Sequence, residues 1–254
     1  MKTWTTVREW QARRTELKGS IGLVPTMGAL HAGHGALVER CRRENDIVVV
    51  SIFVNPTQFN NPSDLERYPR TVEQDLKLLA SLGTDDVLMP AAGELYPDGY
   101  RLRIEGGSAV EGMEGAHRPG HFQGVMTIVL KLLNLVRADR AYFGEKDYQQ
   151  LQVIREMVRD FFVPTEVIPC ETVRAASGLA LSSRNTLLSD AGREGAASVY
   201  RSLTTAATAE EARRMLDAEG FAVDYVEERW GRRFAAAVLE GVRLIDNVPV
   251  GEEK

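Results

Sequence analysis

The pattern of apolar positions begins with two strand-like runs separated by a segment with helical spacing. Apolar and β-branched residues fill Ile21–Thr26 and Ile47–Val54, and the second run shows no polar alternation, which is typical of a parallel strand covered on both faces. Between them, after His34, apolar residues recur at the spacing of one helix face: Ala36, Leu37, Val38 and Cys41. This part of the chain therefore predicts a β-α-β unit.

The same alternation continues downstream. It predicts helices at Thr71–Leu82, Gly124–Val136 and Asp147–Phe161, and strands at Asp86–Pro90 and Arg140–Phe143. Near the N-terminus, Thr3 is predicted to cap a helix that ends near Gly19 and whose apolar side carries Trp4, Val7, Trp10 and Leu17. This order predicts an α/β fold with a doubly wound, Rossmann-like parallel sheet, which binds ligands at the carboxyl ends of its strands.

The composition and the hydrophobic pattern of the sequence change after Val167–Cys170. Ala- and Arg-rich helical material at Asp190–Ala218 precedes short strand-like runs at 222–226, 234–239 and 242–245. We therefore predict a smaller α+β domain over 173–254, after a catalytic domain over 1–172. The segment Arg174–Gly178, with small residues and a glycine, is a predicted hinge between them.

Composition narrows the class of protein. The chain has 254 residues, 44% hydrophobic and 26% charged, as expected for a soluble globular protein. A net charge of −5 argues against a binder of nucleic acid or anionic membranes. Neither a signal-like N-terminus nor an apolar run of membrane-spanning length is visible. Two cysteines without a ligand-type or disulfide pattern fit a reducing cytoplasm.

The segment Val24–His34 carries the strongest chemical signal. His31 and His34 lie three residues apart across a glycine, where a strand gives way to a turn and a helix start. Free backbone N–H groups and the positive end of a helix would meet there, an arrangement that suits a polyphosphate with an imidazole donor beside it. The alternative is a chance pair or half of a metal site. Two histidines complete no zinc site, however, and neither Cys41 nor Cys170 has ligand-type spacing with them.

Amide and cationic side chains follow other predicted strands. Asn55 and Gln58 come where the second strand ends and would hydrogen-bond the hydroxyls of a small substrate, although Asn55 before a proline also fits a plain turn. In Phe143–Gln150, Lys146 suits phosphate, Asp147 stands at a helix N-cap and Gln150 would face the cleft. The alternative for this segment is a solvated helix start.

Two loops complete the set of candidates. Leu179–Asn185 places two serine hydroxyls beside Arg184, whose guanidinium matches phosphate oxygens, or else forms a capped turn with a solvated arginine. Arg118–Gly124 precedes a predicted helix, contains glycines and would form a wall or mobile rim of the pocket.

Taken together, these motifs resemble the pantoate–β-alanine ligase family of the His-x-Gly-His nucleotidyltransferase superfamily. The resemblance covers Val24–His34, Phe53–Phe59, Glu66–Thr71, Arg118–Lys131, Tyr142–Leu151, Leu179–Asn185 and Arg243–Asn247. It implies that ATP and (R)-pantoate form pantoyl adenylate and pyrophosphate, and that β-alanine then displaces AMP to give pantothenate. It also implies Mg²⁺ with ATP as co-substrate, a cytoplasmic homodimer, and only small molecules as other partners. The sequence names no protein ligand for the metal.

The resemblance also implies residue roles. His34, His31, Lys146 and Arg184 would be catalytic. The ATP site would comprise Met27, Gly28, Ala29, Leu30, His31, Ala32, Gly33, His34, Gly144, Glu145, Lys146, Asp147, Val173, Leu181, Ser182, Ser183 and Arg184. Pantoate and β-alanine would contact Gln58, Gln150, Asn55, Arg118 and Tyr68.

Two departures from the family pattern bear on the small domain. Ser177-Gly178 stands where the family usually has Asp-Gly, and Val226–Phe234 is shorter than expected, which predicts a shortened lid. Two other functions are alternatives. One is another His-x-Gly-His nucleotidyltransferase acting on a small acid or phosphorylated substrate, against which Gln58 and Gln150 argue. The other is an RNA-binding fragment related to class I aminoacyl-tRNA synthetases, which the acidic charge disfavours.

Overall fold

The structure is a computed structural model that describes residues 1–251. The chain divides into two compact units. Unit 1 comprises Met1–Glu145 and Gln149–Cys170, and unit 2 comprises Lys146–Tyr148 together with the chain from Glu171 onward. Each unit has its own sheet and its own core.

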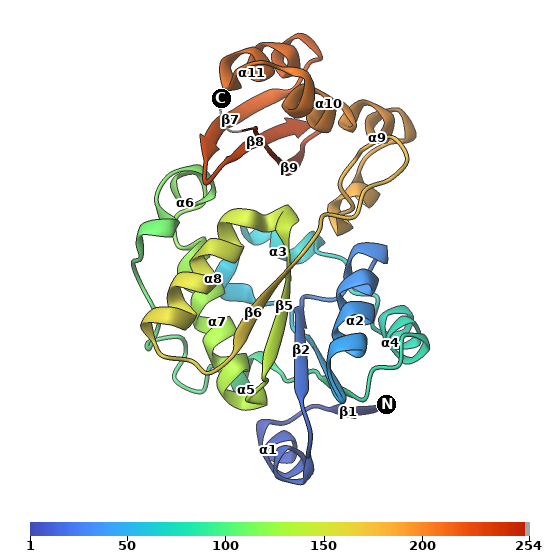
Figure 1. Cartoon of the computed structure of the whole chain (residues 1–254), viewed down its shortest axis with the longest axis vertical. Helices are drawn as coiled ribbons and strands as arrows, with labels where there is room; N and C mark the ends of the chain where they lie inside the picture. The colour runs from blue at the N-terminus through green and yellow to red at the C-terminus, as the bar shows by residue number, and fades with distance from the viewer. Residues whose placement is uncertain (252–254) are drawn as a thin grey trace. The chain divides into compact units, whose positions relative to one another are not determined.

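Unit 1 is built on a parallel sheet of six strands in the order β1-β4-β3-β2-β5-β6 (Figure 1). The strands are β1 (Lys2–Trp4), β2 (Ile21–Thr26), β3 (Ile47–Ile52), β4 (Asp86–Leu88), β5 (Arg140–Gly144) and β6 (Glu166–Cys170). From β2 the order proceeds outward through β3 and β4, whereas β5 returns to pair with the other side of β2. The sheet is therefore doubly wound, with its switch point between β2 and β5.

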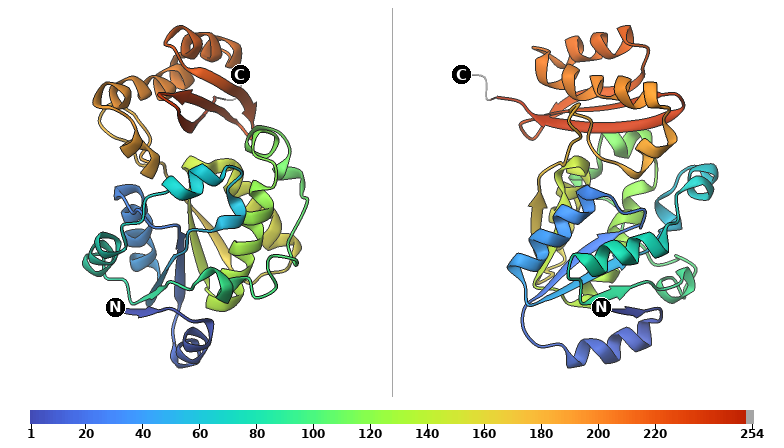
Figure 2. Two further views of the ribbon diagram at one scale, coloured as in Figure 1. Left: turned by 180° about the vertical axis from the view of Figure 1, so that it is seen from behind. Right: turned by 90° about the vertical axis from the view of Figure 1, so that its right-hand side faces the viewer.

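Helices cover both faces of this sheet. The longest are α1 (Val7–Glu16), α2 (Ala32–Glu44), α4 (Val72–Ser81), α7 (His121–Val136) and α8 (Tyr148–Asp160). Short helical turns occupy η1 (Pro56–Gln58), α3 (Pro62–Arg67), α5 (Ala92–Leu95), η2 (Ser108–Val110), α6 (Met113–His117) and η3 (Glu145–Asp147). Helix α2 packs on β2, β3 and β5, while α7 packs on β2 and α1 (Figure 2).

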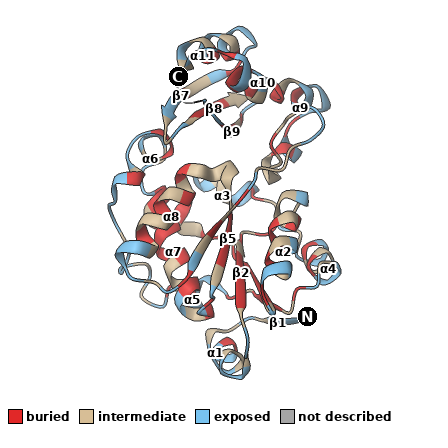
Figure 3. Cartoon of the chain, viewed as in Figure 1, coloured by how far each residue is buried: buried red, intermediate tan, exposed pale blue. Residues whose placement is uncertain are grey.

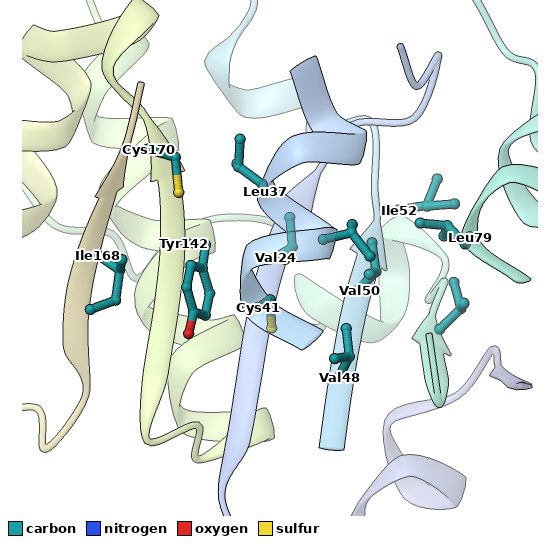
Figure 4. Close-up of a cluster of buried hydrophobic side chains, with 12 residues drawn as sticks. Val24, Leu37, Cys41, Val48, Val50, Ile52, Leu79, Tyr142, Ile168 and Cys170 are labelled. Atoms are coloured by element: carbon teal, nitrogen blue, oxygen red, sulfur yellow. The ribbon is translucent and has the colours of Figure 1, made fainter. Parts of the chain in front are cut away.

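The core of unit 1 follows the two-residue period of its strands. Val24, Val48 and Val50 point toward Leu37 and Cys41 of α2 (Figure 4). The register places Leu23, Val49 and Ala141 side by side, and these alternate residues face the opposite side of the sheet. Residues Val48–Val50 are all fully buried, as the apolar run predicts for a central parallel strand. The neighbouring strand β2 is also largely buried (Figure 3).

Unit 2 has a three-stranded antiparallel sheet in the order β7-β8-β9. The strands are β7 (Ala222–Arg229), β8 (Arg232–Leu239) and β9 (Val242–Pro249); the helices are η4 (Ser183–Leu187), α9 (Asp190–Ala196), α10 (Ser198–Thr205) and α11 (Ala209–Ala218). Two-residue turns with positive φ at both positions, Trp230-Gly231 and Glu240-Gly241, join the strands. Helices α10 and α11 pack against this sheet.

Two local predictions are wrong. Residues Lys2–Trp4 form a strand beside β4, and the first helix starts after Thr6, whose side chain accepts the Glu9 N–H group. Tertiary pairing with β4 thus overrides the helical spacing of Trp4 and Val7. Helix α7 starts at His121, three residues before the predicted start. Asp147 stands directly before Tyr148, the first residue of α8, so its role as N-cap stays a prediction. Among residues 1–251, no helix has the length and hydropathy needed to cross a bilayer.

Candidate active site

The carboxyl ends of β2, β3 and β5 lie next to one another in unit 1, because these three strands are neighbours and parallel. The segments that leave them contain Met27–His34, Asn55–Gln58 and Gly144-Glu145. A direct contact joins the first two segments, since Nε2 of Gln58 lies 3.1 Å from Sδ of Met27. The candidate site is thus at the switch point of the sheet, where doubly wound folds bind their ligands.

The turn after β2 is fixed by a buried carboxylate. Oδ2 of Asp75 accepts the Ala29 N–H group at 2.9 Å, and Oδ1 accepts the Leu30 N–H group at 2.8 Å. Gly28 and Ala29 have φ values of +78° and +49°, and a Cβ atom on Gly28 would lie 3.0 Å from Asp75 Oδ2. The expectation that the N–H groups of this turn are free for phosphate is therefore wrong for Ala29 and Leu30.

Asp75 was not among the predicted site residues. The available signal was its place in α4, one turn before the apolar Leu79, so that both side chains share the buried face of the helix. Thr71 supports the carboxylate from the start of the same helix, because its hydroxyl donates to Oδ1 at 3.0 Å.

His31 and His34 form a reciprocal cap at the start of α2. Nδ1 of His31 accepts the Gly33 N–H group at 3.1 Å, and Nδ1 of His34 accepts the N–H group of His31 at 3.3 Å. The ring centroids lie 4.1 Å apart. Because each Nδ1 acts as an acceptor, the neutral rings carry their proton on Nε2, which makes two neighbouring Nε2–H donors. This pair fits the chemistry predicted from the sequence, a hydrogen-bond donor set for phosphate oxygens.

Asn55 lies fully inside unit 1 and fixes the direction of the Gln58 side chain. Nδ2 of Asn55 donates to the Gly124 carbonyl at 3.2 Å, whereas its Oδ1 accepts from the Tyr96 hydroxyl at 2.8 Å. The same Nδ2 lies 3.0 Å from Gln58, so the atom facing it must be the acceptor Oε1. The amide NH₂ of Gln58 is consequently the end that points away from Asn55, toward Met27.

Arg118 and Tyr68 are placed near this turn by different contacts. Arg118 pairs with Glu114 at 3.3 Å, and its Nη2 lies 3.5 Å from the Gln58 carbonyl. The Tyr68 ring packs edge-on against Phe59, with centroids 5.7 Å apart. The two residues therefore flank η1 and its successor Phe59.

The two glutamines at the start of α8 differ in environment. Gln149 is buried, and its amide bonds the backbone of Ala109, Gly112 and Glu114, so it anchors the loops around α6. The predicted residue Gln150 is half-buried, as are Gly144 and Glu145 at the end of β5. Gln149 is a structural residue that the sequence pattern did not distinguish from its neighbour.

The remaining predicted ATP residues belong to unit 2. The Lys146 carbonyl accepts Nδ2 of Asn247 at 2.9 Å, and the Lys146 ammonium lies 4.0 Å from Asp147. Oγ of Ser182 accepts the Arg184 N–H group at 3.3 Å and caps η4. A backbone bond from Leu181 to the Val173 carbonyl joins the two ends of this loop. Val173 and Leu181–Arg184 are all half-buried.

The predicted hinge segment Arg174–Gly178 is a fixed turn of unit 2. The Arg174 guanidinium donates to both oxygens of Asp246 and lies 4.0 Å from the Tyr200 ring centroid. Gly178 has a φ of +92°, and a Cβ atom there would lie 2.5 Å from Tyr200. A hinge motion within this segment would have to break these contacts.

The described residues include no cluster of metal-ligating side chains and no exposed thiol. Residues 1–251 contain no group of three or more His, Cys, Asp or Glu side chains that would hold a metal ion. Cys41 and Cys170 are free and buried, and burial raises the pKa of both thiols, to about 12 for Cys41.

Comparison with known proteins gives one consistent result. The model of the family "Pantoate-beta-alanine ligase" matches residues 1–249. The pantothenate synthetase of Bdellovibrio bacteriovorus is 50% identical over 242 residues, which cover 95% of this chain and 96% of the relative. The pantothenate synthetase of Legionella pneumophila is 47% identical over 249 residues, with 97% and 99% covered.

Solved structures agree with the sequence comparison. The crystal structure of pantoate–β-alanine ligase from Francisella tularensis, complexed with beta-gamma ATP and beta-alanine, has a TM-score of 0.94 at 43% identity. It matches 98% of this chain and 97% of that one. Pantothenate synthetase from Thermus thermophilus has a TM-score of 0.91 at 44% identity, over 98% and 99% of the two chains. The chain therefore belongs to the pantoate–β-alanine ligase family.

Proposed function

We propose that the site at the ends of β2, β3 and β5 activates (R)-pantoate with ATP and then transfers the pantoyl group to β-alanine. The chain is an ATP-dependent ligase of this family, so the overall product is pantothenate. In the first step, the pantoate carboxylate attacks the α-phosphorus of ATP and pyrophosphate leaves. In the second step, the β-alanine amine attacks the acyl carbon, AMP leaves and the amine loses a proton.

The observation that carries this proposal is the pair of imidazoles at the end of β2. Attack of a carboxylate on a triphosphate brings two anions together, so catalysis rests on positioning and on donors that neutralise developing charge. The Nε2–H groups of His31 and His34 are fixed by the backbone bonds to their Nδ1 atoms and need no rearrangement to act as such donors. No enzyme nucleophile is required, because the carboxylate of the substrate attacks.

We propose the following assignment for the nucleotide. Met27–His34 and Gly144–Asp147 hold ATP together with Val173 and Leu181–Arg184. His34 is the main donor to the phosphates, with His31 beside it, and Lys146 and Arg184 neutralise phosphate charge. Arg184 suits phosphate oxygens through its planar guanidinium, whereas Lys146 acts as a compact point charge.

The acceptor substrates are assigned to the segments after β3 and in α8. Gln58 presents its NH₂ group, which suits the hydroxyl and carboxylate oxygens of pantoate. Gln150 supplies a second amide, and Gln58 also contacts β-alanine. Asn55 is fully buried, so it acts by orienting Gln58, while Arg118 and Tyr68 flank the pocket.

Mg²⁺ enters the proposal as part of the substrate MgATP. The described residues include no cluster of ligating side chains that would hold the ion, so its ligands would be phosphate oxygens and water. The proposal therefore assigns no protein side chain as a ligand of the ion.

The experiment that tests this proposal omits β-alanine. Enzyme mixed with MgATP and (R)-pantoate should release about one equivalent of pyrophosphate in a burst, and ¹⁸O should scramble within ATP when pyrophosphate is retained. A parallel reaction without pantoate is the control and should give neither signal. Pyrophosphate that appears only after β-alanine is added would contradict an adenylate intermediate.

Three broader assignments are also proposals. We expect the protein to be cytoplasmic, because a reducing compartment suits its two free thiols. We also expect a homodimer, and sedimentation at several concentrations measures the oligomeric state. We expect the C-terminal residues 173–254 to act as a short lid over bound nucleotide. Solution scattering with and without an ATP analogue plus pantoate measures that closure. An unchanged radius of gyration in a fully active enzyme would contradict the lid.

A further inference from the structure

We propose that His121 is a positioning residue for Gln58 and acts as a neutral imidazole with its proton on Nδ1. The inference rests on the proposed role of Gln58 in binding pantoate. His121 is the first residue of α7 and only 6% exposed. Both of its ring nitrogens have a polar partner: Nδ1 lies 2.9 Å from the Gln58 carbonyl, and Nε2 lies 3.1 Å from Nη1 of Arg118.

These partners leave one assignment of the ring proton. A carbonyl oxygen only accepts, so Nδ1 must donate to Gln58; a guanidinium only donates, so Nε2 must accept from Arg118. An imidazolium would lose the second bond and would place a second cation beside Arg118. The charge of Arg118 is balanced on its other side by Glu114, at 3.3 Å. His121 therefore carries the opposite tautomer from His31 and His34.

The Gln58 backbone depends on contacts with α7. Within η1 the Gln58 N–H group has only a long bond, 3.5 Å, to the Asn55 carbonyl. The first turn of α7 packs closely against η1. A Cβ atom on Gly124 would lie 2.6 Å from the Thr57 carbonyl oxygen and 2.7 Å from the Gln58 nitrogen. His121 fastens the Gln58 carbonyl to the same helix. Asn55 orients the side chain of Gln58, and His121 fixes its backbone.

This geometry predicts different results from two amide substitutions. The Nδ2 atom of asparagine lies near the position of Nδ1, so His121→Asn retains a donor toward Gln58. Glutamine reaches the position of Nε2, so His121→Gln keeps a partner for Arg118 but leaves the Gln58 carbonyl without its donor. We expect the pantoate KM to rise by about tenfold or more in His121→Gln and by much less in His121→Asn, because the buried Gln58 carbonyl would lose its 2.9 Å donor and keep only the long 3.5 Å contact with Nη2 of Arg118. The ATP KM should change little in either variant.

Gln58→Met serves as the reference variant. If it leaves the pantoate KM unchanged, the proposed role of Gln58 is wrong whatever His121 does. If Gln58→Met raises the pantoate KM while His121→Asn and His121→Gln behave alike, the positioning role of His121 is overturned. Melting temperatures of both His121 variants separate a general loss of folding from a specific change in KM.

The tautomer can be measured on the unmodified protein, and a substituted protein is needed only to assign the His121 signal. The chain has four histidines, so a long-range ¹H–¹⁵N spectrum of the imidazoles is simple to assign with one substitution. At neutral pH we expect His121 to show protonated Nδ1 and bare Nε2. A protonated Nε2 or an imidazolium at His121 would overturn the inference.

Discussion

Nδ2 of Asn55 lies 3.0 Å from Oε1 of Gln58, and this contact decides which end of the Gln58 amide faces Met27 in the candidate site. The direction is transmitted from the backbone, because the same Nδ2 also donates to the carbonyl of Gly124. A glutamine in a substrate site works as a donor or an acceptor according to how it is turned. In this protein the buried Asn55 sets the orientation of the Gln58 amide in the absence of substrate.

Asn55→Asp should therefore weaken pantoate binding. The carboxylate would face two acceptors, the Gly124 carbonyl and Gln58 Oε1, so that Gln58 turns its NH₂ inward. We expect a loss of about 1–3 kcal/mol, which corresponds to about 5- to 150-fold in the pantoate KM. Thr57→Val is a matched control, since it removes only the hydroxyl that donates to Asn55 Oδ1 at 2.9 Å. Equal effects of the two substitutions in steady-state kinetics would refute the orienting role of Asn55.

His34→Ala should slow adenylate formation by about 10²–10³-fold, the size expected for the loss of one transition-state donor. His34→Gln should restore part of that rate, because its side-chain NH₂ lies near the position of the lost Nε2–H. Rapid-quench measurement of the pyrophosphate burst tests both. His117→Ala, at an exposed position of α6, is the control and should retain the normal burst. A normal burst in His34→Ala would remove His34 from the catalytic assignment.

Asp75→Asn should loosen the turn before the two histidines. Asparagine keeps one acceptor oxygen but turns an NH₂ group toward the Ala29 or Leu30 N–H group, so one backbone donor is left unpaired. That loss is about 1–3 kcal/mol, and we expect it in the ATP KM and in thermal stability. Glu73→Gln, which changes an exposed carboxylate in the first turn of the same helix, should alter neither quantity. Wild-type ATP affinity in Asp75→Asn, measured by calorimetry, would show that the turn needs no such anchor.

Cys41 should be inert in the folded protein. Burial raises its pKa to about 12, so at pH 8 only about one thiol in 10⁴ is ionised, and a thiol reagent should label it only after unfolding. The sign of the linked stability follows: the folded state resists ionisation, so stability is lost as the pH rises above the ordinary value of about 9. Chemical denaturation at pH 8 and pH 10.5 measures this loss, and Cys41→Ala should reduce it. Rapid labelling of native protein at pH 8 would contradict the prediction.

The sequence by itself determined the strands and helices that pack on both sides. Ile47–Ile52 is apolar except for Ser51 and shows no polar alternation, and such a run has few stable places other than the centre of a parallel sheet. The spacing of His31 and His34 after β2 likewise determined that the two imidazoles lie together, because the cap they form is local to the chain. The family motifs along the chain also predicted the membership that the comparisons establish.

Tertiary structure decided the contacts between distant segments. Trp4 spaces well with Val7 for a helix, but its backbone is held in a strand through pairing with Leu88. Nothing local marks Asp75 as the acceptor for Leu30, 45 residues earlier in the chain, or His121 as the partner of Gln58, 63 residues away. A hydrogen bond depends on where two groups meet in space. Hydrophobic periodicity indicates which face of a helix or strand is buried, but it does not indicate which polar group of a distant segment will lie against that face.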